Sequence, residues 1–152
     1  MNIYGYGAYS NSVTIIPTDV PDKVDIPSVV ISLKDVKVSW GAPDDHYSSI
    51  DSYEILFEEE DGSYTTDTAD CDGNDTSVIN STLCYVPMTT MIAKTSLPVD
   101  SLIRVKVRAH NSKGWGDYSE LNTDGATIET IPTQMSSPTY DLSLSSNSIA
   151  YV

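Results

Sequence analysis

The sequence VKVSWGAPDD, at residues 36–45, joins an alternating apolar stretch to a turn. Val36, Val38 and Trp40 are separated by single polar residues, so in an extended chain they would point to the same side. The GAPDD that follows contains the Gly, Pro and Asp residues that favour turns. This stretch therefore predicts a strand with one buried face, followed directly by a turn.

The same alternation recurs twice, and there the residues between the apolar ones are mostly charged. The apolar positions are Tyr53, Ile55 and Phe57, alternating with Glu54, Leu56 and Glu58, and then Ile103, Val105 and Val107, alternating with Arg104, Lys106 and Arg108. Shorter candidate strands lie at 63–68, 83–88 and 127–130. Because no stretch keeps an apolar period of 3.6 residues, the sequence predicts an all-β fold, and its short, regularly spaced strands favour a β-sandwich.

Length and charge limit what the chain can do. Its 152 residues are enough for one domain of ordinary size, and 22 acidic against 8 basic residues give a net charge of −14. Nucleic acid is a poor partner for such a chain, because phosphate binding needs a basic face. This segment has neither the ~18-residue apolar run of a membrane span nor a signal peptide at Met1. Twelve acidic residues fall within 44–75, where a solvated surface is favoured over divalent cation binding.

Three stretches taken in order resemble a known family. VKVSWGAPDD, then IDSYEILFEEEDGSY, then LIRVKVRAHNSKGWGDYS look like strands B, C, F and G of a fibronectin type III domain that covers about residues 21–132. The resemblance implies an immunoglobulin-like β-sandwich in which Trp40 is the buried strand-B tryptophan and Tyr53 an inward aromatic of strand C. It departs from the family pattern at Ile103, where an aromatic residue is usual, and at 88–101, which is longer than the usual E–F connection.

Two details narrow the resemblance. The pairing of CDGND with TLCYVP, together with the long connection after it, is similar to fibronectin type III repeats in large surface proteins of ciliated protists. Strands C and F are neighbours in this family. The resemblance therefore implies that the outward Glu54 and Glu58 face Arg104, Lys106 or Arg108 across the sheet.

A phrase repeated within the chain predicts more than one copy of this domain. NIYGYGAYS at 2–10 and NSKGWGDYS at 111–119 share five of nine positions at a constant offset of 109 residues. If the second phrase is the F–G turn of one domain, the first is the same turn of a preceding domain. VTIIP at 13–17 then matches ATIETIP at 126–132 as strand G and the exit from it.

The other end of the chain repeats in the same way. LSLSSNSIAYV at 142–152 resembles ISLKDVKVSW at 31–40, the region of strands A and B. Residues 1–20 are therefore predicted to end a preceding repeat, 21–132 to form a complete domain, and 133–152 to start a following repeat. Either further repeats continue the polypeptide, which is favoured, or neighbouring copies donate strands to cover the incomplete ends. The apolar residues left uncovered would be Tyr4, Tyr6, Tyr9, Ile15 and Ile16 at one end and Leu142, Leu144, Ile149 and Tyr151 at the other.

The two cysteines, Cys71 and Cys84, could be reduced core residues, a metal pair or a disulfide. A metal pair would need further ligands close by, and the only histidines, His46 and His110, stand alone and far away. Cys71 stands between aspartates in a turn, which disfavours a core position. A disulfide is the favoured interpretation, and it implies an oxidising compartment and thus a secreted, extracellular protein.

Other candidate sites lie in the same loop. Asn74 and Asn80 both begin the N-X-Ser/Thr pattern of N-linked glycosylation. Asp70, Asp72 and Asp75 have a spacing similar to calcium loops but lack the terminal bidentate Glu, so a plain acidic turn is favoured over a metal site.

Catalysis finds little support in the sequence. His46 lies in a turn with Asp44, Asp45 and Ser48, but neighbours on one loop do not provide the geometry of a catalytic triad, and no nucleophile elbow is present. His110 is expected to cap a turn after strand F. The chain is therefore predicted not to be an enzyme and to bind no cofactor.

Two functions from different classes remain. The first is a structural repeat of an extracellular filament or surface coat, serving as spacer and self-assembly element among neighbouring repeats in a homopolymeric assembly. The second is an adhesion or receptor ectodomain, or an accessory binding module of a larger secreted protein. The chain has no Arg-Gly-Asp tripeptide, and tandem near-copies favour the first function.

Overall fold

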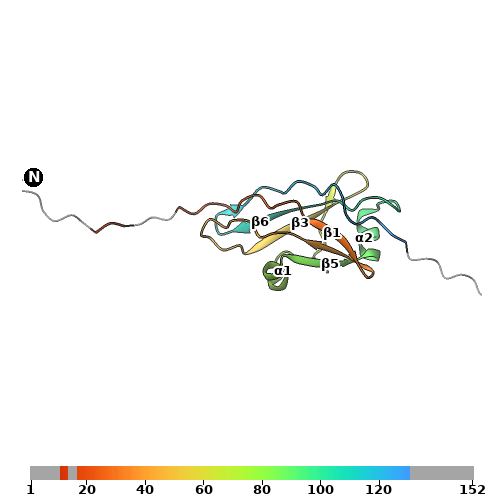
Figure 1. The fold of residues 1–152 in the computed structure, drawn as a ribbon, viewed down its shortest axis with the longest axis horizontal. Helices are drawn as coiled ribbons and strands as arrows, with labels where there is room; N and C mark the ends of the chain where they lie inside the picture. Colours follow the sequence, from red (N-terminus) through yellow and green to blue (C-terminus); the bar gives the residue numbers. More distant parts are fainter. Residues whose placement is uncertain (1–10, 14–16, 131–152) are drawn as a thin grey trace, which may run out of the picture.

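A computed structural model of the 152-residue chain describes residues 11–13 and 17–130 (Figure 1). Apart from 11–13 and 17–20, the partial repeats predicted at 1–20 and 133–152 lie outside the described residues. The division of the chain into three repeats therefore stays a prediction.

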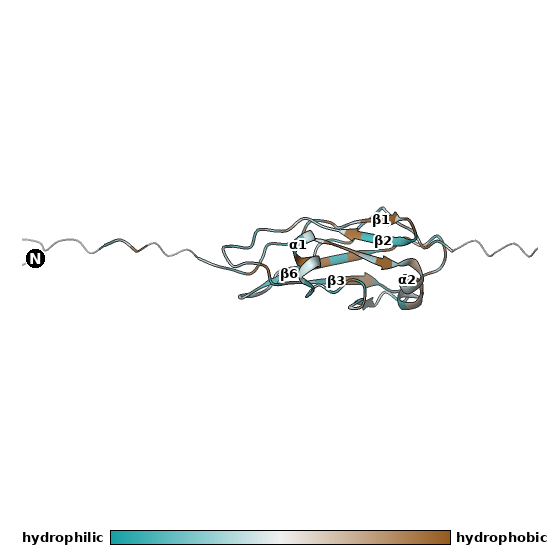
Figure 2. Cartoon of the chain, turned by 90° about the horizontal axis from the view of Figure 1, so that it is seen from below, coloured by the Kyte–Doolittle hydropathy of each residue, from teal (hydrophilic) through white to brown (hydrophobic). Residues whose placement is uncertain are grey.

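Two antiparallel sheets pack face to face. The three-stranded sheet has the order β1-β2-β5, and its strands are β1 (Ser28–Ser32), β2 (Asp35–Ser39) and β5 (Leu83–Pro87). The four-stranded sheet has the order β4-β3-β6-β7, and its strands are β4 (Tyr64–Thr65), β3 (Ser52–Glu58), β6 (Val105–Asn111) and β7 (Gly114–Trp115). Figure 2 shows β1 and β2 in one layer and β3 and β6 in the other. This arrangement confirms the predicted β-sandwich.

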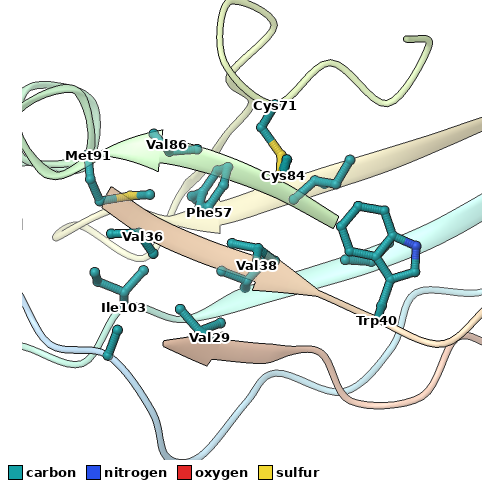
Figure 3. Close-up of a cluster of buried hydrophobic side chains, with 14 of the residues drawn as sticks. Val29, Val36, Val38, Trp40, Phe57, Cys71, Cys84, Val86, Met91 and Ile103 are labelled. Atoms are coloured by element: carbon teal, nitrogen blue, oxygen red, sulfur yellow. A yellow bond between two sulfur atoms is a disulfide. The ribbon is translucent and has the colours of Figure 1, made fainter. Parts of the chain in front are cut away.

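The core lies between the sheets and is built from the alternating positions. Every apolar residue predicted to point inward is at most 7% exposed: Val36, Val38, Trp40, Tyr53, Ile55, Phe57, Ile103, Val105 and Val107. Figure 3 shows Val36 and Val38 of β2, and Trp40 just after that strand, gathered in one cluster with Phe57 of the other sheet. The rings of Trp40 and Tyr53 meet edge to face with centroids 5.2 Å apart. Residues 17–130 thus contain a closed core of their own.

Two helices that the sequence did not predict occupy connections between strands. Helix α1 (Thr76–Ser81) begins where the Asp75 side chain accepts a hydrogen bond from the Ser77 backbone N–H, and ends at Thr82 in a left-handed conformation. Helix α2 (Met88–Thr95) fills the long E–F connection and buries Met88 and Met91. Helices of six and eight residues are too short to show a helical period in the sequence.

The expected strands at 127–130 and 63–68 form only in part. Residue Thr127 makes an isolated bridge to Leu102, flanked by backbone hydrogen bonds from the Ile103 N–H to the Ala126 carbonyl and from the Ile128 N–H to the Ser101 carbonyl. Earlier in this segment, side chains replace backbone partners. Asn122 accepts a hydrogen bond from the Val105 N–H (2.7 Å) and donates one to the Ile103 carbonyl (2.9 Å). The strand near residue 63 stops after Thr65, and Asp67 then accepts from the Ala69 N–H in a tight turn.

Candidate interaction surfaces

The disulfide predicted between Cys71 and Cys84 is present, and their Cα atoms lie 5.2 Å apart. It ties the acidic loop to β5 (Figure 3). Both cysteines are only 3% exposed, so the bond also belongs to the core. The expectation that Cys71 would avoid the core was therefore wrong, because the turn that holds it folds onto the sandwich.

The two glycosylation candidates are both exposed. Asn74 donates a hydrogen bond from its side chain to Asp72 (3.0 Å), and Asn80 lies on α1. Both side chains lie at the surface, as a glycan requires. Glycosylation of either asparagine remains a prediction.

The calcium candidates serve local turns. Asp72 accepts a hydrogen bond from the Asn74 backbone N–H (2.9 Å), and Asp75 caps α1. The hydrogen bond from the Ser77 backbone, followed by that from its hydroxyl, lowers the pKa of Asp75. Within the described ranges, Asp70 and these neighbours do not form a group of three or more His, Cys, Asp or Glu residues that could hold a metal ion.

The histidines take only some of the partners suggested by the sequence: His46 keeps Asp44, whose side chain accepts a hydrogen bond from the His46 backbone N–H (2.8 Å). His46 lies 3.0 Å from Asp22, whose hydrogen bond is the main cause of its raised pKa, while Ser48 pairs with Ser112 instead. His110 is inside β6 rather than capping a turn after it. His110 pairs with Trp115 of β7 across the hairpin, and the centres of the two rings lie 4.7 Å apart. The strand therefore extends through His110.

The outer face of the four-stranded sheet carries the charge pairs implied by the family resemblance. Arg104 pairs with Glu58 (2.9 Å) and Arg108 with Glu54 (2.6 Å), because β3 and β6 are neighbours in register. Lys106 is different. It lies opposite Leu56, and no ion pair holds it in the part of the chain that the structure describes.

Aromatic rings lie against Lys106 and Arg108. The sequence analysis did not predict these contacts. The Lys106 ammonium lies 3.4 Å from the centre of the Tyr64 ring and 4.8 Å from that of Tyr118. The guanidinium carbon of Arg108 lies 4.3 Å from the centre of the Tyr118 ring and 4.6 Å from that of Trp115. The rings come from β4, β7 and the segment after it, so only the fold brings them together. The Arg104–Arg108 alternation was the one visible signal.

Tyr118 is the link between the ionic and aromatic contacts. Its hydroxyl donates a hydrogen bond to Glu54, the same carboxylate that pairs with Arg108. Burial, and then the hydrogen bond and charge of Glu54, raise the pKa of Tyr118 to about 12. Beside it, a groove of about 660 Å³ is lined in part by Tyr64, Lys106 and Tyr118.

At one end of the sandwich, the entering chain is held by Asn111, which is fully buried. Its side-chain amide donates hydrogen bonds to the carbonyls of Asp19 (2.8 Å) and Asp45 (3.2 Å). The described chain leaves at the opposite end, through Glu129 and Thr130 (Figure 1). Entry and exit at opposite ends are the arrangement that allows domains to follow one another in a line.

Within the described residues, seven strands form a sandwich of two antiparallel sheets, and this strand order defines an immunoglobulin-like β-sandwich protein. The chain belongs to the fibronectin type III domain family, whose model matches residues 21–123. Neither described helix is long and apolar enough to cross a membrane. No curated protein matches the sequence.

Solved structures agree with this fold. The sixth fibronectin type III domain of human fibronectin type III domain containing protein 3 is 17% identical, with a TM-score of 0.52, over 82% of this chain and 97% of that chain. The structure of titin kinase and its flanking domains is 21% identical, with a TM-score of 0.50, over 74% of this chain. This chain spans only 17% of the length of the latter. Identities this low show the fold alone.

Proposed function

We propose that this domain is one repeat of an extracellular multi-domain filament or surface coat, in which it acts as a spacer and self-assembly element. Fibronectin type III domains commonly occur in multi-domain proteins. The buried disulfide supports an oxidising, extracellular location.

The proposal rests on the positions at which the two copies of the repeated phrase are identical. The five positions that 111–119 shares with 2–10 all have structural work in the described domain: Asn111, Gly114, Gly116, Tyr118 and Ser119. The four positions that differ are all exposed: Ser112, Lys113, Trp115 and Asp117. A chance match would not select the positions that the fold needs.

Each shared position has its own physical reason. Asn111 holds the entering chain, and Gly114 has a φ of 136°, which other residues rarely adopt. A Cβ at Gly116 would collide with the Pro21 carbonyl. Tyr118 lies against Arg108, and the Ser119 hydroxyl accepts a hydrogen bond from the Val107 N–H (3.0 Å). These are the requirements of one β6–β7 hairpin, so we infer that residues 2–10 specify a second one.

Electron microscopy of the native material tests this function. Material from the source cells, labelled with an antibody raised against residues 17–130, should be extracellular and should form elongated, beaded particles. Compact particles of single-domain size, or labelling confined to the cytosol, would contradict the proposal.

A binding module is the second candidate, and the groove beside Lys106 favours it. A lysine held by two tyrosine rings instead of a carboxylate leaves a positive charge available on an otherwise acidic domain. An adhesion or receptor ectodomain would present this face to an anionic partner. Lys106→Ala should then abolish attachment of the native protein to its target surface, whereas a purely structural repeat would assemble unchanged.

A further inference from the structure

An apolar cleft of about 490 Å³ lies at the end of the domain where the described chain leaves. Its lining includes Leu33 from the β1–β2 turn, Pro87 and Met88 at the start of α2, and Glu129 and Thr130 from the exit. Leu33 is 97% exposed and has a φ of 60°. A leucine that is both strained and uncovered stabilises nothing inside this domain.

The lining carries charge of both signs, with Lys34 beside Leu33 and the carboxylates of Asp35 and Glu129. No carboxylate pairs with Lys34 among the residues that the structure describes. An occupant that suits this cleft therefore has an apolar or aromatic tip, and Lys34 is the lining group that can pair with a carboxylate beside that tip.

The opposite end of the domain presents such a tip. Tyr47 is 77% exposed and stands directly after Asp44, Asp45 and His46 in the loop that follows β2. Asn111 holds the Asp45 carbonyl, and the Asp45 side chain accepts a hydrogen bond from the Tyr47 N–H (2.9 Å). The loop is thus fixed by its own bonds and projects an aromatic ring beside two carboxylates.

The covalent tether between repeats is short enough to bring these two ends together. Pro-Thr stands at 17–18, ahead of the entry residue Asp19, and again at 132–133. The residue equivalent to Asp19 in the next repeat is therefore Gln134, four residues beyond Thr130, which lines the cleft. Four residues span at most about 14 Å. The entry end of the following repeat must consequently lie within that distance of the cleft, at a high effective concentration.

We propose that the cleft lined by Leu33 and Met88 is the seat for the Tyr47-bearing loop of the following repeat. The tyrosine ring packs against Leu33, Pro87 and Met88, and Lys34 faces the carboxylates that precede the ring. This inference rests on the proposed function. It adds the contact that fixes the angle between successive domains and so stiffens the filament.

A two-repeat protein tests the contact: residues 18–132 followed directly by residues 18–132. Only the cleft of the first copy faces a Tyr47 loop, so each substitution has a matched control in the other copy. Leu33→Asn suits the left-handed backbone and should not disturb folding. In the first copy it should lower the midpoint of thermal unfolding by about 3–6 °C. In the second copy it should leave the midpoint unchanged.

Tyr47→Ala gives the reciprocal result, with an effect in the second copy and none in the first. Combining it with Leu33→Asn in the first copy should cost no more than either change alone, because both remove the same contact. Equal effects in both copies, or a two-repeat protein that unfolds at the midpoint of a single repeat, would overturn the inference. The filament proposal would survive that result, because it is tested separately on the native material.

Discussion

The two faces of the β3–β6 pair are made by alternate residues of the same two strands, yet they contribute differently to stability. The inner face presents Phe57 and Val105 and is at most 3% exposed, while the outer face presents the charge pairs and aromatic rings. Burial of apolar area is the dominant favourable term in folding, whereas exposed ion pairs contribute little. The comparison teaches that the inner face holds the domain together, while the outer face helps to set the register of the strands.

The largest expected effect comes from two residues adjacent in β3, Phe57 and Glu58. Phe57→Ala leaves a cavity between the sheets and should reduce the free energy of unfolding by about 3–5 kcal/mol. Glu58→Ala, one position along, should cost less than ~1 kcal/mol. Urea denaturation of both variants measures the two losses in the free energy of unfolding. Similar losses would mean that the two faces share the stability, and the comparison would fail.

The disulfide ties the acidic loop to the three-stranded sheet. In the chain-entropy model a loop of this length contributes about 3 kcal/mol. The double variant Cys71→Ala with Cys84→Ala should therefore unfold at markedly lower denaturant concentration, and a reducing agent should have no further effect on it. If the unmodified protein were equally insensitive to reduction, the cross-link would not stabilise the fold.

The Arg104–Glu58 pair should show a small, salt-dependent coupling. A double-mutant cycle with Arg104→Gln and Glu58→Gln is expected to give about 0.2–1 kcal/mol at low salt and less at 1 M salt. A coupling of several kcal/mol that persists at high salt would mean that this pair behaves like a buried ion pair. The outer face would then contribute to stability as the inner face does.

The titration of Tyr118 gives the most specific expected effect. Its pKa is raised from 10.0 to about 12 in the folded protein. The stability linked to this group is therefore present below pH 10 and lost as the pH rises toward 12. Because burial also raises the pKa of Tyr53, ultraviolet titration should show late tyrosine ionisation from two groups, of which Tyr118→Phe removes one. A late titration that is unchanged in the Tyr118→Phe variant would contradict this prediction.

Period-2 alternation predicted the inner face residue by residue, because burial on one side of a strand leaves a direct trace in the sequence. Combined with the family's strand neighbours, it also predicted the charge pairs of Glu54 and Glu58. It could not predict Asn122, whose side chain imitates backbone hydrogen bonds, since such bonds follow no period. The rings around Lys106 were equally hidden, because Tyr64 and Tyr118 are 54 residues apart and meet only across the folded sheet.

The intact mass of the native polypeptide tests the central claim, that this domain is one repeat among several. The protein should be isolated from its source under denaturing, reducing conditions and detected with an antibody against residues 17–130. We expect a single chain several times larger than the 16.5 kDa of these 152 residues. A discrete chain of 16.5 kDa would contradict the account.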